Sequence, residues 1–65
     1  MKLYRYLTGP DDATFCLRVC EALNSGWELH GGPTLTFDGT RVVAGQAVVK
    51  EVPGQFHRDM DLSKA

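Results

Sequence analysis

One stretch near the end of the chain constrains its fold more than any other. Residues 41–52, RVVAGQAVVKEV, place apolar side chains at both odd and even positions. Successive side chains of a β-strand point to opposite faces of a sheet, so this strand needs cover on both sides. We therefore expect it at the centre of a sheet. Its apolar residues divide into Val42, Ala44 and Val48 on one face and Val43, Ala47 and Val49 on the other.

A hairpin is predicted to lead into this central strand. Asp38-Gly39 is a strong signal for a tight turn, and a two-residue turn would pair Phe37 with Thr40, Leu35 with Val42 and Leu29 with Val48. The preceding strand, WELHGGPTLTF (27–37), alternates with one unbroken parity. Gly31, Gly32 and Pro33 interrupt its middle, and proline cannot donate to a strand ladder. We expect an edge strand that is bent or bulged there.

The N-terminal half predicts a strand followed by a helix. KLYRYLT (2–8) alternates, with Tyr4 and Tyr6 on one face. The helix should run from about Asp11 to Asn24, capped by Thr8 in a capping box or by Asp11 itself. Gly26 is expected at the left-handed position that ends the helix. The predicted inward stripe consists of Cys16, Val19, Cys20 and Leu23.

This order of elements predicts an α+β fold. We expect a single β-α-β-β layer, with a three-stranded mixed sheet, the third strand central, and one helix packed on one face. The domain should cover residues 1–52, and residues 53–65 lose the pattern and are predicted to form a C-terminal tail.

One helix covers only one face of a sheet, so the other face is expected to carry uncovered apolar residues. Val43, Ala47 and Val49 should lie there. A contiguous apolar patch on a small domain is typical of an interaction surface. We expect a homo-oligomer, most simply a two-fold dimer, that packs through this open face. The predicted function is a small non-enzymatic interaction or regulatory module, with a further protein partner as a second possibility.

Size and charge exclude several classes of protein. With 65 residues the chain forms one domain, and its net charge of −1 disfavours nucleic-acid binding. No apolar run reaches the roughly 20 residues of a membrane span, and the N-terminus lacks the apolar core of a signal peptide. A cytoplasmic protein with reduced cysteines is the expectation.

Few residues suggest chemistry. Cys16 and Cys20 lie four apart on the predicted helix and would form half of a metal site, completed by His30 or His57. The alternative is two small buried apolar side chains, and the absence of a second close cysteine pair favours it. His30 has no nucleophile or acid at a recognisable spacing. We therefore expect no enzyme activity, no metal and no cofactor.

A small-ligand pocket is the alternative function. It would be bordered by Tyr4, Tyr6, Trp27 and His30, where aromatic rings and an imidazole supply stacking and hydrogen bonding. Tyr4 and Tyr6 on an exposed sheet also fit base stacking, but the charge balance argues against that use.

Three segments carry a resemblance to a known family: YRYLTGPDD (4–12), EALNSGWEL (21–29) and GGPTLTFD (31–38). The chain resembles a family of small bacterial and phage proteins, a domain of unknown function, over roughly residues 1–52. The resemblance implies a compact single domain and brings no activity, cofactor or catalytic residue. Cys16 and Cys20 are not part of its motif.

Overall fold

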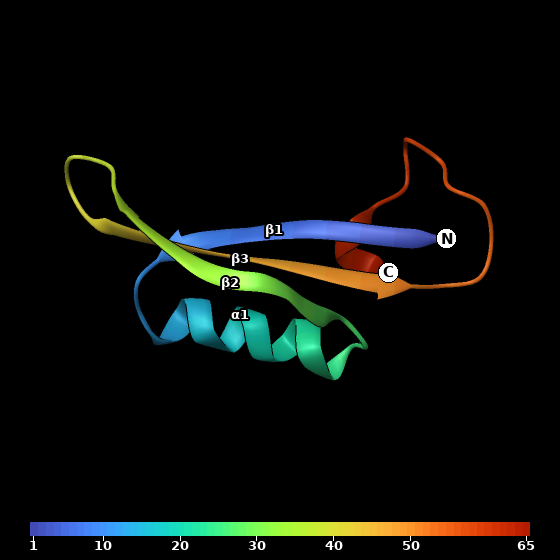
Figure 1. Ribbon diagram of the computed structural model, residues 1–65, viewed down its shortest axis with the longest axis horizontal. Helices are drawn as coiled ribbons and strands as arrows, with labels where there is room; N and C mark the ends of the chain where they lie inside the picture. Colours follow the sequence, from blue (N-terminus) through green and yellow to red (C-terminus); the bar gives the residue numbers. More distant parts are fainter.

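The computed structural model describes residues 1–65 and contains three strands and one α-helix. In chain order these are β1 (Lys2–Pro10), α1 (Ala13–Asn24), β2 (Glu28–Phe37) and β3 (Val42–Glu51), followed by a short 3₁₀ turn, η1 (Leu62–Lys64). The strand order is β1-β3-β2. Figure 1 shows the long, narrow sheet with α1 running beside it and the tail curving back toward the N-terminus.

The α+β class, the central third strand and the single covering helix are confirmed. The sheet is antiparallel throughout rather than mixed. The reason is the strand order itself: β1 and β2 run in the same direction, but β3 lies between them, so no parallel pair forms.

The register confirms one predicted pair and corrects the turn. Leu29 lies opposite Val48, as expected, but Phe37 pairs with Val42 rather than Thr40. The loop therefore comprises residues 38–41. The Asp38 carboxylate organises it by accepting from the backbone N–H groups of Thr40 and Arg41 at 2.8 and 2.9 Å. This local hydrogen bonding favours a longer loop over the two-residue turn.

A bulge in β2 restores the predicted register farther along the strand. The irregularity lies between His30 and Thr34, where the glycines and proline occur, and it confirms the predicted interruption. Gln46 stands opposite this segment and is only 5% exposed. Its Nε2 donates to the carbonyl oxygens of Gly31 at 3.3 Å and Ala47 at 2.9 Å. A buried amide thus supplies donors that the irregular ladder lacks.

The ends of α1 differ slightly from expectation. Asp12, rather than Thr8 or Asp11, is the N-cap, with Oδ1 accepting from the Phe15 N–H at 3.2 Å. The cap moves because β1 continues to Pro10, and the Asp11 N–H bonds to the carbonyl of Val42. Gly26 follows the C-cap with φ +96°, which confirms its predicted role, since glycine adopts that conformation without a Cβ clash.

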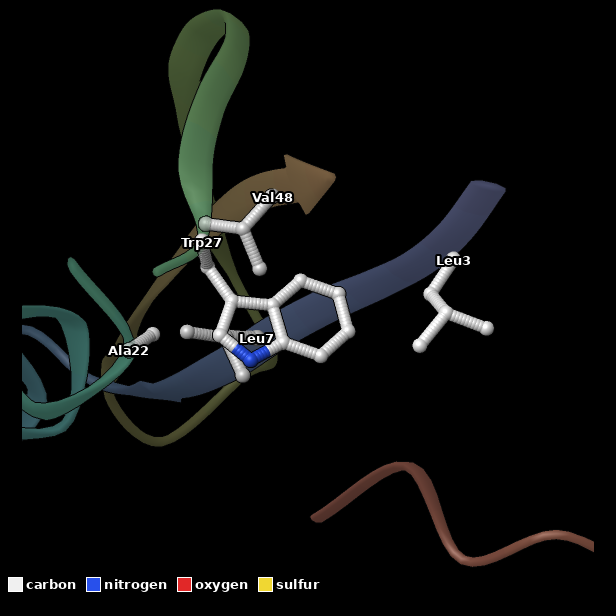
Figure 2. Packing of buried hydrophobic residues seen from close by; sticks show 5 residues of the cluster. All are labelled: Leu3, Leu7, Ala22, Trp27 and Val48. Atoms are coloured by element: carbon white, nitrogen blue, oxygen red, sulfur yellow. The ribbon is translucent and has the colours of Figure 1, made fainter. Parts of the chain in front are cut away.

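The core is small and centred on one indole ring. Its buried members are Leu3, Leu7, Ala22, Trp27 and Val48. Figure 2 shows the Trp27 ring in the middle of this cluster, with Ala22 of α1 on one side and Leu3 on the other. Ala22 is the one buried residue of α1.

The inward stripe of α1 was predicted with the wrong rotation. Phe15, Val19 and Ala22 face the core, whereas Cys16 and Cys20 are exposed. Ala22 is the position where the helix meets the bulky Trp27 ring, and its small side chain permits that approach. Because Ala22 faces the core, Cys16 and Cys20 face sideways, toward β2.

Residues 53–65 return to the core instead of trailing away. Met60, Leu62 and Ala65 pack against the buried cluster, and Phe56 stays 62% exposed. The Val52 N–H donates to the Met1 carbonyl at 2.9 Å and extends the β1–β3 ladder to the point where this tail begins.

Candidate functional site

The residues predicted to border a ligand pocket lie on opposite faces of the sheet. Tyr4, Tyr6 and His30 share the face that α1 leaves open, where Tyr6 and His30 both lie opposite Ala47. Trp27 lies under α1 and is only 3% exposed. The structure therefore does not bring these four residues into one pocket.

On the open face, a hydrogen bond between two side chains crosses the central strand β3. Tyr6 Oη and Thr34 Oγ1 are 2.6 Å apart, one on each side of β3. Gly45 lies between them, and a Cβ at that position would come within 2.6 Å of Tyr6 Oη. Glycine is therefore required for the phenol to lie across β3.

The predicted interface residues Val43, Ala47 and Val49 also lie on this open face. Each is half-buried. Charged and polar side chains are interspersed among them, since Glu28 lies opposite Val49 and His30 opposite Ala47.

A larger uncovered apolar region lies on the helix side, where the sequence predicted core. A groove of about 330 Å³ runs between α1 and β2. Its lining residues are Phe15, Cys16, Val19, Cys20, Leu29, Pro33 and Gln46. None of them is charged, and we call this space the apolar groove.

Apolar side chains continue this groove along the end of the hairpin. Leu35 is 66% exposed and Phe37 64% exposed, with Val42 directly opposite Phe37. We call the groove together with Leu35, Phe37 and Val42 the apolar surface. Sequence reasoning placed these residues on the helix side correctly but assumed that the helix would cover them.

The position of α1 explains this exposure. Arg18 Nη1 donates to the Thr8 carbonyl at 2.6 Å, and the Phe15 ring lies against Gly9, so the first half of the helix packs on β1. The β2–β3 hairpin projects beyond the start of α1 (Figure 1). The inward residues at the end of β2 are thus left without a partner from their own chain.

The thiols and imidazoles do not converge. Cys16 and Cys20 are free and exposed beside the apolar groove. His30 points to the opposite face of the sheet, and His57 lies in the tail. No group of three or more His, Cys, Asp or Glu side chains is placed to hold a metal ion. The cysteines are surface residues, which corrects the prediction of two buried apolar side chains.

Two carboxyl groups have a shifted pKa, and both lie in exposed turns. Hydrogen bonds from the backbone N–H groups of Arg41 and Thr40 lower the pKa of Asp38. The Ser63 hydroxyl and backbone N–H lower the pKa of Asp61 in the same way. Both shifts follow from turn geometry, and neither group lies in the apolar groove.

Together these features define a class: a small antiparallel α+β domain with one helix and an extended apolar surface that its own chain does not cover. The chain belongs to the DUF1737 family, a domain of unknown function, whose model matches residues 1–51. The predicted resemblance to a domain of unknown function is thereby confirmed. Neither the curated proteins nor the solved structures contain a match to the chain. The one α-helix lacks the length and apolar character needed to cross a membrane.

Proposed function

We propose that this domain is a non-enzymatic association module that pairs with a second copy through its apolar surface. The observation that carries the proposal is the exposure of Leu35 and Phe37, at 66% and 64%, on the same face of the sheet as an uncharged groove. Contiguous apolar surface of this kind is typical of protein interfaces. A second copy is the simplest partner, because it supplies the same apolar groups in a two-fold arrangement.

The size of the molecule supports this interface. Its longest dimensions are 41 and 23 Å, so one long face offers the about 800 Å² per partner that stable complexes bury. The total accessible surface is 4787 Å², so such an interface would remove about a sixth of it from water. A 65-residue domain with five buried core residues gains proportionately from that additional burial.

The helix side is a better interface than the open face on which self-association was first expected. The apolar groove contains no charged residue, whereas Glu28 and His30 stand among the apolar residues of the open face. Burying an unpaired charge is costly, so the uncharged surface is favoured. Val43, Ala47 and Val49 then contribute to the monomer rather than to the interface.

Sedimentation equilibrium tests the proposal directly. We expect the mass of two chains at micromolar concentration and dissociation on dilution. A mass of one chain at every concentration up to the millimolar range contradicts self-association.

Two matched variants locate the surface. Leu35→Asp places a charge on the apolar surface and should abolish the dimer. Thr36→Asp places the same charge at an exposed position of the open face and should leave the mass unchanged. The reverse result would return the interface to the open face.

A further inference from the structure

The tail is attached to the domain in an unusual way. Met60, Leu62 and Ala65 pack against the core cluster, yet no hydrogen bond or ion pair joins residues 53–65 to the rest of the chain. Its polar contacts are internal, such as the Met60 N–H to the His57 carbonyl at 3.3 Å. The tail is therefore held by side-chain packing, and it can leave without breaking a hydrogen bond or an ion pair to the domain.

The site beneath the tail combines an apolar floor with a cation. The tail packs against the core cluster, and we call its members Leu3, Leu7 and Trp27 the floor of the site. Arg5 is half-buried beside them, with its guanidinium 5.6 Å from the centroid of the Trp27 ring. No carboxylate lies within ion-pairing distance of Arg5. A half-buried guanidinium without an ion pair is available to an acidic ligand.

The tail residues complement this site by alternation. Met60 and Leu62 are half-buried, whereas Asp59 and Asp61 between and beside them are exposed. Asp61 has extended backbone, and its Oδ1 accepts from the Ser63 N–H at 3.0 Å and from the Ser63 hydroxyl at 2.6 Å. The hydrogen bonds from Ser63 are the main cause of the lowered pKa of Asp61, and the positive charge of Arg5 also lowers this pKa.

The tail does not fill the site. A cavity of about 190 Å³ remains beside it, between α1, β1 and the tail. Arg5, Arg18, Glu21 and Trp27 are among the domain residues that line it, and Ser63 and Ala65 line it from the tail. The match to the family ends at residue 51, so the tail lies outside the family domain and covers a site made by that domain.

We propose that β1, α1 and Trp27 form a docking site for a peptide segment in which acidic and apolar residues alternate, and that Asp59–Leu62 is its intramolecular occupant. An incoming segment of the same pattern displaces the tail and gains the cavity that the tail leaves empty. This site is separate from the apolar surface on the β2 side, so the proposal stands independently of self-association.

Trp27 is the only tryptophan and makes the test direct. In the full chain, Met60→Asp with Leu62→Asp should release the tail, which shifts the Trp27 emission to longer wavelength and raises acrylamide quenching at least two-fold. A synthetic peptide of residues 53–65 should then bind this variant saturably and reverse both changes. The same peptide carrying the two substitutions is the matched control and should not bind. Unaltered protein should bind the native peptide at least ten-fold more weakly, because its own tail competes.

Several outcomes would overturn the proposal. One is a folded double variant, judged by far-UV circular dichroism, in which Trp27 stays shielded. Another is an exposed Trp27 that the native peptide does not protect at millimolar concentration. If the variant does not fold, added native peptide should restore its circular dichroism, and failure to do so also refutes the site. A dimer that depends on Met60 and Leu62 would show that the tail occupies a second copy instead.

Discussion

Replacing Phe37 by alanine should weaken the dimer strongly while leaving the monomer nearly unchanged. The side chain is 64% exposed in the single chain. Burying a whole phenylalanine side chain contributes about 1.5–3 kcal/mol, so the exposed part contributes about 1–2 kcal/mol. A two-fold interface contains the residue twice, which makes the loss about 2–4 kcal/mol per dimer. The dimer Kd should therefore rise about 30-fold to 1000-fold.

Sedimentation velocity over a dilution series measures this change. Thr36→Ala is the matched control, because Thr36 is the adjacent residue and points to the open face. It should change Kd by less than about two-fold, in line with the usual small effect of a surface substitution. Thermal unfolding of the monomer at low concentration checks that both variants keep their fold. An unaltered Kd in a folded Phe37→Ala protein would remove the apolar surface from the interface.

Three further predictions follow from the local geometry. Gly45→Val should lower the free energy of unfolding, measured by urea titration, by about 1–3 kcal/mol, because the Tyr6 phenol that lies across β3 must move. Gly32→Val is the control: its side chain meets open space, so it should change the free energy of unfolding by less than about 0.5 kcal/mol. Loop hydrogen bonds lower the pKa of Asp38, so the ionised carboxylate stabilises the fold at neutral pH, and this stabilisation is lost as the pH falls through the lowered pKa. Asp38→Asn should therefore reduce the loss of stability between pH 7 and pH 3. An identical loss in the variant would contradict this. Cys16 and Cys20 should react with a thiol reagent several-fold more slowly above the dimer Kd than below it, and a rate independent of concentration would argue against burial of the groove.

The sheet was predictable because its pattern is local. The two-sided apolar character of β3 matches its burial on the helix side and its half-burial between β1 and β2 on the open face, and a central strand has that environment. Gly26 and the Gly31–Pro33 interruption were predictable for a similar reason, since each reflects a backbone requirement at its own position. The length of the turn was not, because side-chain hydrogen bonds from Asp38 selected the longer loop.

The rotation of α1 was not predictable from its sequence. The helix ATFCLRVCEALN carries apolar residues around most of its circumference, so more than one inward stripe fits the pattern. Contact with Trp27, a residue outside the helix, selected the stripe that contains Ala22. The same choice exposed Cys16 and Cys20 and opened the apolar groove.

The candidate sites were the least predictable part of the molecule. Trp27 was predicted to border one pocket with Tyr4, Tyr6 and His30, and its separation from them is evident only once the faces are assembled. The docking of Met60 and Leu62 had no signal in the pattern, because a few apolar residues in a polar segment fit a free tail equally well.

The sequence by itself determined the number and order of the elements and which face each strand residue occupies, because these depend on alternation between neighbouring residues. Only the tertiary structure decided which inward-facing residues are covered. The 12 residues of α1 span about 18 Å, whereas the 10 residues of β2 extend over about 33 Å. One short helix therefore cannot cover the whole face, and the position it takes beside β1 and Trp27 leaves Leu35 and Phe37 for a partner.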